Sequence, residues 1–259
     1  MTTMVLAAGD EFVAPGVKDF FPPPIFGDVT KPMVLAVLSI LIIGTFFLVA
    51  SRGLKLVPGK FQFIAESIYD VGRNSIAREQ IGSKDFTPFV PLLLTVFTFI
   101  LVNNLFGIIP VIQFPTMAHI GFPLAVSVLV IYPVYHFVGF KRHGFLGYLK
   151  HQTVPPGAPW FVLILLTPIE FFQKFFLNPL TLAIRVFAAM FAGHLLLMVF
   201  TLAGEFLLLN GGITDVVAPV AFAFAIALTF LEALIMVLQA YIFALLSANY
   251  IGAALAEEH

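Results

Sequence analysis

The sequence has no cysteine, one tryptophan and few charged residues. Without cysteine there is no disulfide framework, thiolate metal site or cysteine nucleophile. Charged residues make up only 10% of the 259 positions, and a net charge of -1 gives no basis for nucleic-acid binding. We also expect no cleavable signal, because MTTMVLAAG at the N-terminus lacks basic residues and its apolar run is short. We expect no cofactor and no bound metal.

Hydrophobic residues, in contrast, are abundant. They make up 60% of the chain, and the mean hydropathy is +1.04. Both values exclude an ordinary soluble globular protein. The sequence predicts an all-α integral membrane protein with about five membrane-embedded helices. An extended, external N-terminal tail over residues 1–31 would precede a single membrane domain over residues 32–259, which contacts lipid.

Charge-free stretches predict the first three membrane helices. A bilayer core of about 30 Å needs roughly 20 helical residues at about 1.5 Å each. The stretches that meet this length are residues 33–50, residues 88–110 and residues 122–140. Between the first two, residues 60–80 place apolar residues at helical spacing with the charges elsewhere. This pattern is typical of an amphipathic helix that lies on the membrane surface.

The C-terminal region contains two apolar stretches that are too long for ordinary spans. They cover residues 160–209 and residues 216–255, and Glu232 is the only charge within the second. Forty helical residues measure about 60 Å, twice the thickness of the hydrocarbon layer. Each stretch could instead form a pair of shorter spans, but no charged turn divides residues 216–255. We therefore expect two long, strongly inclined helices, joined by a turn at NGGITD, residues 210–215.

Basic residues indicate the orientation of the chain. Lysine and arginine are concentrated in residues 51–87 and 141–159, which the positive-inside rule places in the cytoplasm. The N-terminal tail is then external. Five crossings bring the C-terminus to the cytoplasmic side.

Two ionisable residues lie within the apolar sequence LAIRVFAAMFAGH, residues 182–194. An arginine at the centre of a membrane costs about 2.5 to 3.5 kcal/mol on insertion scales, so Arg185 needs compensation. Because arginine keeps its proton, it acts as a fixed positive charge. At 100° per residue, Ala189, Ala192 and Leu196 lie within about 40° of Arg185, and His194 lies about 180° away. Arg185 therefore lies on a helix face with small side chains, separate from the face of His194. Such a small-sided face would allow another helix to approach closely.

The last predicted helix carries a second polar group of residues. Glu232, Gln239 and Tyr250 fall within about 20° of one stripe. Such a stripe would face a partner helix or a water-filled cavity rather than lipid. If the two long helices form a hairpin, Arg185 can meet the Gln239 face and His194 can approach Glu232. A carboxylate beside an imidazole makes a plausible route for protons.

Simpler interpretations of the same residues remain open. Arg185 could form a packing ion pair with Glu170 or Glu232. Gln239 and Tyr250 could each make an ordinary interhelical hydrogen bond. Asn103 and Asn104, in NNLFGIIP, could belong to a motif that packs and ends a helix.

Together these segments resemble subunit a of the F-type ATP synthase membrane sector. The resemblance runs from about residue 30 through PFVPLLLTVFTFILVNNLFGIIP, TPIEFFQKFFLNPLTLAIRVFAAMFAGH and EALIMVLQAYIFALLSANY. One departure is Ala189, where the family usually has asparagine. The family's essential arginine, its acid and imidazole positions and its polar residues on the last helix match Arg185, His194, Glu232, Gln239 and Tyr250. Candidate channel-lining residues are Asn103, Asn104, Glu170 and Asn178.

The resemblance implies a function for this set. In the family, two long inclined helices wrap a ring of c subunits, and each c subunit carries a membrane carboxylate. It implies a proton-translocating stator subunit with two half-channels, non-catalytic by itself, in a bacterial plasma membrane. Its partners would be the c ring, the b-subunit peripheral stalk and the remainder of the complex. The alternatives are a proton-coupled secondary transporter, with its own substrate cavity, and a structural membrane anchor.

Overall fold

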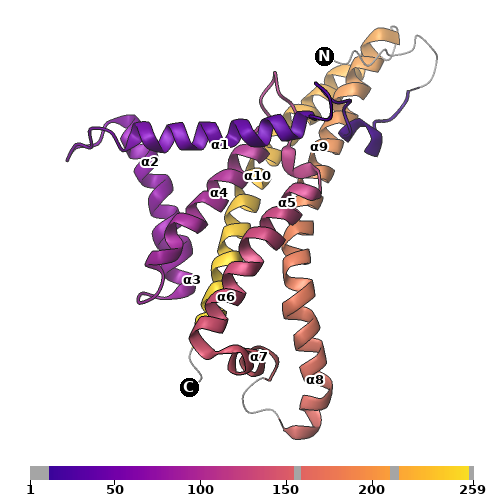
Figure 1. Cartoon of the computed structure of the whole chain (residues 1–259). Coiled ribbons are helices and arrows are strands. Elements are labelled where there is room, and N and C mark those ends of the chain that lie inside the picture. The colour runs from indigo at the N-terminus through magenta and orange to yellow at the C-terminus, as the bar shows by residue number, and fades with distance from the viewer. Residues whose placement is uncertain (1–11, 155–158, 211–215, 257–259) are drawn as a thin grey trace.

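The computed structural model describes residues 12–154, 159–210 and 216–256, and over these residues the chain is almost entirely helical (Figure 1). The only β feature among them is an isolated bridge between Phe26 and Val29. Five helical segments are long and apolar enough to cross a membrane. The prediction of an all-α membrane protein is therefore confirmed. The five segments are Lys31–Ala50, Thr87–Leu105, Gly121–His143, Trp160–Leu209 and Ala218–Leu255.

The first three segments match the predicted spans except at their ends. Helix α1 covers Lys31–Ala50 and α4 covers Val90–Leu105, after a 3-10 turn at Thr87–Phe89. The predicted span 88–110 extends five residues too far, because the chain turns after Leu105 with a hydrogen bond from Gly107 N to Asn104 O of 2.9 Å. Because the residues of this turn are apolar, the hydropathy pattern does not show where the helix ends.

The third segment is longer than the predicted 122–140. Helix α5, Gly121–Ala125, continues through a π-helical stretch into α6, Tyr132–His143. Gly144 then ends the helix with a φ of 72°, a value that glycine adopts easily. The basic residues 141–143 complete the last turn, where cations interact favourably with the helix dipole.

The chain between the predicted spans contains two further helical regions. The amphipathic region consists of α2, Lys60–Asp70, a π-helical stretch, and α3, Glu79–Ile81, close to the predicted 60–80. Its second half packs against α4 and buries Ile76 and Ala77 completely. Helix α7, Phe145–Thr153, lies within a region that the sequence suggested only as a basic linker. It packs closely on α6, where a Cβ on Gly139 would lie 2.1 Å from the Tyr148 ring.

The C-terminal half of the chain forms one long helical hairpin (Figure 1). Its first arm consists of α8, Trp160–Phe172, a π-helical stretch and α9, Asn178–Asn210. Its second arm is α10, Ala218–Leu255, with 38 residues. At about 1.5 Å per residue, α10 measures roughly 57 Å, far more than a hydrocarbon layer of about 30 Å. The predicted turn at 210–215 falls almost wholly outside the described residues.

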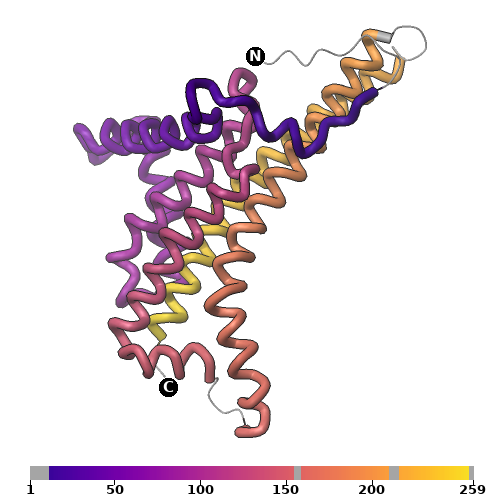
Figure 2. Tube along the Cα trace, turned by 45° about the vertical axis from the view of Figure 1, so that its right-hand side comes forward, coloured from indigo at the N-terminus to yellow at the C-terminus, as the bar shows by residue number. Residues whose placement is uncertain are grey.

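The direction of α1 differs from that of the hairpin. Figure 1 shows α1 running across α9 and α10, so these helices cannot all follow the normal of one membrane. The main core lies where α10 packs against α9, α4 and α6. Figure 2 shows the N-terminal segment, from residue 12 onward, passing along α9 rather than leaving the protein.

Candidate functional site

The hairpin brings His194 and Glu232 together, as the sequence predicted. His194 Nδ1 on α9 lies 3.6 Å from Glu232 Oε1 on α10, and only 6% and 3% of the two side chains are exposed. Gly193 lies beside the pair, and a Cβ there would make only ordinary van der Waals contact with the Glu232 side chain, at 3.6 Å. The pair therefore lies inside the helix interface, hidden from lipid.

The polar atoms of this pair are unusually poor in partners. His194 Nδ1 and both carboxylate oxygens of Glu232 are buried without a hydrogen bond to any part of the chain that the structure describes. An unsatisfied buried polar group costs about 1 to 3 kcal/mol, so such groups are rare unless water, a proton or a function requires them. Three such atoms side by side make this pair a candidate functional site.

Arg185 has the opposite environment. Its side chain is exposed on α9, beside the exposed small residues Ala188 and Ala192. Ala189, at the position of the family's usual asparagine, is half-buried beside this face. The expected small-sided face is thus present. It lies on the exposed side of α9.

The carboxylates proposed as packing partners of Arg185 are engaged elsewhere. Glu170 pairs with Lys174 at 3.2 Å, and Glu232 lies against His194. Among the described residues, no ion pair with Arg185 is present. The guanidinium does interact electrostatically with the phenol of Tyr250 on α10. An ion pair within this chain therefore does not explain the arginine.

Lys174 also links the start of the hairpin to the helices beside it. Its ammonium group donates to Gln152 O on α7 at 2.7 Å, and its own carbonyl accepts from the Tyr135 hydroxyl at 3.1 Å. The Tyr135 ring in turn lies 5.9 Å from that of Tyr250. Tyr135 was not among the predicted site residues, because its partners Lys174 and Tyr250 lie far away in the sequence.

The other predicted polar residues are distributed along the interfaces. Asn103 donates to Ser39 Oγ on α1 at 2.8 Å, and Asn104 donates to Met236 O on α10 at 3.3 Å. These bonds agree with the packing interpretation. Gln239 is half-buried with an unpartnered Oε1, and Asn178 is half-buried at the start of α9. The structure therefore joins His194 to Glu232, while Asn103 and Asn104 tie α4 to α1 and α10.

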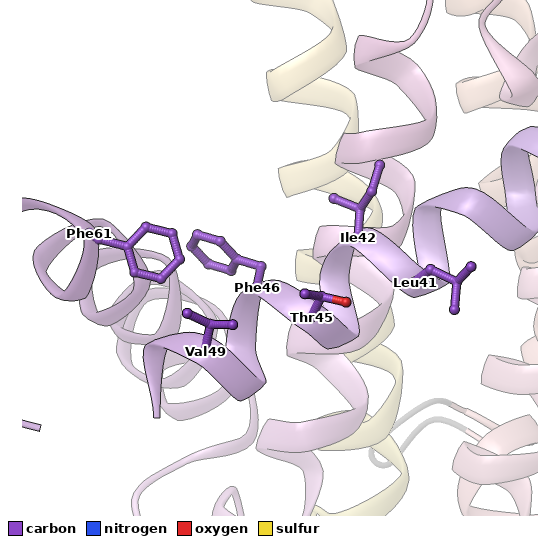
Figure 3. Close-up of a pocket in the computed structure, with 6 residues that line it drawn as sticks. All are labelled: Leu41, Ile42, Thr45, Phe46, Val49 and Phe61. Atoms are coloured by element: carbon purple, nitrogen blue, oxygen red, sulfur yellow. The ribbon is translucent and has the colours of Figure 1, made fainter. Parts of the chain in front are cut away.

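A shallow apolar cavity of about 420 Å³ lies at the corner between α1 and α2, far from these residues in the chain. Figure 3 shows the six side chains that line it, with the Phe46 and Phe61 rings facing each other. Thr45 is the only polar residue among them. No arrangement of three or more metal-binding side chains occurs within the described parts of the chain.

The fold and these residues define a class: a polytopic α-helical membrane protein with ionisable groups at the centre of a long hairpin. A family profile described as "ATP synthase A chain" matches residues 33–252. "ATP synthase subunit a" of Nocardioides sp. (strain ATCC BAA-499 / JS614) is 45% identical, with 98% of this chain and 96% of the relative covered. The same subunit of Streptomyces lividans is 42% identical, with 97% and 90% covered. The chain belongs to the ATP synthase A chain family, and the resemblance seen in the sequence is confirmed.

Proposed function

We propose that this chain is the proton-translocating stator subunit of an ATP synthase membrane sector, not catalytic by itself. Two half-channels would lead protons to and from a ring of c subunits that turns against the α9–α10 hairpin. The observation that carries this proposal is the exposed arginine on a small-sided helix face, without an ion-pair partner in the described chain. A cation of this kind within a membrane-spanning helix calls for an anion from outside the described chain.

Arg185 would attract the carboxylate of a c subunit once that group has lost its proton. At 4 Å, and with an effective dielectric constant near 20, the attraction is about 4 kcal/mol. This offsets an insertion cost of about 2.5 to 3.5 kcal/mol for the arginine. The fixed charge would also prevent protons from passing directly between the two half-channels.

The His194–Glu232 pair would serve the outer half-channel. Both groups exchange protons within reach of neutral pH when their surroundings change, and both are buried with unpartnered atoms. Gln239 and Tyr250 would line the path between this pair and Arg185. A proton that crosses a potential of 100 mV releases about 2.3 kcal/mol, which rotation of the ring would convert into work.

The orientation follows from the positive-inside rule. We expect the N-terminus to be external and the C-terminus cytoplasmic, in the plasma membrane of a bacterium. The b-subunit stalk would hold the chain still while the c ring turns. Both partners belong to the complex for which the relatives are named.

ATP-driven proton pumping in inverted membrane vesicles tests the proposal. Arg185→Ala should abolish pumping while the c ring remains bound, because the ring carboxylate loses its attracting charge. Ile184→Ala is the matched control, since Ile184 is exposed on the same turn of α9 without a charge. Normal pumping by Arg185→Ala would contradict the proposal and favour a structural anchor or a secondary transporter instead.

A further inference from the structure

The N-terminal segment before α1 is anchored to the hairpin by several contacts. A 3-10 turn at Val17–Phe20 is closed by a hydrogen bond of 2.7 Å from Gly16 N to Asp19 Oδ2. The Phe12 ring lies 5.6 Å from Phe206 on α9. Further along, the Phe21 ring meets His119 edge-on at 5.1 Å. This segment therefore has a defined path over α9, although the sequence suggested only an extended tail.

Phe20 is the residue of this segment that reaches the proton site. Its side chain is 2% exposed, although it belongs to a short turn outside the membrane helices. Its ring lies 4.5 Å from Phe191 and meets the His194 ring edge-on at 5.9 Å. Edge-to-face contact is a preferred geometry for aromatic rings, so the Phe20 ring favours one orientation of the His194 imidazole.

A cavity of about 560 Å³ lies on another side of the Phe20 ring. Phe20, Phe187, Phe191 and His119 contribute to its wall, whereas His194 and Glu232 do not. Phe20 thus contacts the cavity and His194 at once. The cavity is large enough for several water molecules, and His194 belongs to a pair of buried, unpartnered polar groups.

His119 adds a polar group to this otherwise apolar cavity. It has a hydrogen bond to the backbone of Phe20, and its Nε2 is buried without a partner in the described chain. Burial lowers the pKa of this imidazole below its ordinary value, and the hydrogen bond opposes that shift in part. The imidazole is therefore neutral near pH 7, able to accept a proton or a water hydrogen at the cavity wall.

We propose that Phe20 is a positioning residue that closes the outer end of the proton site. Its ring orients the His194 imidazole and separates the His194–Glu232 pair from the cavity beside His119. Water and protons from the external side reach the pair by passing this ring, instead of through an open channel. The inference rests on the proposed proton path through His194 and Glu232.

Thiol labelling tests the closure directly, because the chain has no cysteine of its own. His194→Cys places a single thiol at the covered position, in the assembled complex in right-side-out vesicles. A charged, membrane-impermeant methanethiosulfonate is added outside, and modification is followed on this chain alone. We expect slow labelling with Phe20 present, labelling several-fold faster with Phe20→Ala, and protection regained with Phe20→Leu, which restores apolar bulk.

Phe12→Ala is the matched control. Phe12 belongs to the same segment and packs on the same helix, but its partner is Phe206 instead of His194. Its loss should leave the labelling rate at position 194 unchanged. Equal labelling rates at position 194 with Phe20 and with Phe20→Ala would overturn the proposal. An equal acceleration by Phe12→Ala would also overturn it. If Phe20→Ala does not assemble, Asp19→Ala should accelerate labelling to a smaller extent, because it releases the turn but keeps the ring.

The same variants with the native His194 connect the closure to function. We expect Phe20→Ala to reduce ATP-driven pumping and Phe20→Leu to restore it. The labelling result does not depend on proton transport. If Arg185→Ala pumps normally while Phe20→Ala exposes position 194, the proposed function fails and the closure stands. If Arg185→Ala abolishes pumping while Phe20→Ala changes neither measurement, only the closure fails.

Discussion

Alanines on the two arms of the hairpin have the same side chain and opposite surroundings. On α10, Ala240, Ala244 and Ala248 are completely buried against the neighbouring helices. On α9, Ala188 and Ala192 are exposed beside Arg185. In a membrane, small residues let helices approach closely, and packing rather than the hydrophobic effect holds the helices together.

The difference shows that this face of α10 has its helical partners within the chain, whereas no described part of the chain covers the face of α9 that carries Arg185. Larger side chains on α9 would meet lipid at no steric cost, so the chain by itself does not require alanine there. Under the proposed function, the exposed alanines would form a surface for a helix of another subunit. The exposed arginine on the same face would then favour a negative charge on that helix.

The largest effect should follow a change on the buried face of α10. A Cβ added at Gly252 would lie 2.3 Å from the backbone oxygen of Gln80 in α3, a contact that the backbone must move to relieve. Gly252→Ala should destabilise the chain by about 1 to 3 kcal/mol and reduce the amount of assembled complex. Gly44→Ala on α1, where a Cβ meets nothing within 4 Å, should leave it unchanged. The yield and thermal midpoint of the purified complex measure both.

A change on the exposed face should impair function without loss of stability. Ala192→Leu adds bulk where no part of this chain is close, so the chain should insert and fold normally. Contact with the c ring and ATP-driven pumping should both decline strongly. Leu196→Ala, on the same face, removes bulk and is the matched control. A stable Ala192→Leu complex that pumps normally would contradict the docking surface on α9.

The smallest effect should come from a substitution of Ala189, which lies between the exposed and the buried faces of α9. Ala189→Asn introduces the residue that the family usually has, one turn after Arg185. The site is half-buried, so the amide can keep contact with water, and stability should change by less than about 0.5 kcal/mol. We expect pumping to remain within about twofold of the unmodified complex, in the vesicle assay used for Arg185. A large loss would show that the alanine itself is required.

The sequence was most informative for properties that depend only on residues close together in the chain. Runs of apolar residues located all five membrane segments, and the angular spacing on α10 indicated that Glu232 would face a protein interior. The same local pattern failed at residues 106–110, because a turn stabilised by its own backbone bonds can be as apolar as a helix. It also gave no indication of α7, whose basic residues resemble those of a linker.

What the sequence by itself determined is the number of membrane segments, the excess length of the last two and the ionisable residues that need partners. Hydropathy and charge act on each segment separately, so these properties can be read in order along the chain. Only the tertiary structure decided that Arg185 is exposed with no ion-pair partner among the described residues, and that Phe20 packs against His194. Those outcomes depend on how the helices pack across large separations in sequence, which no local pattern records.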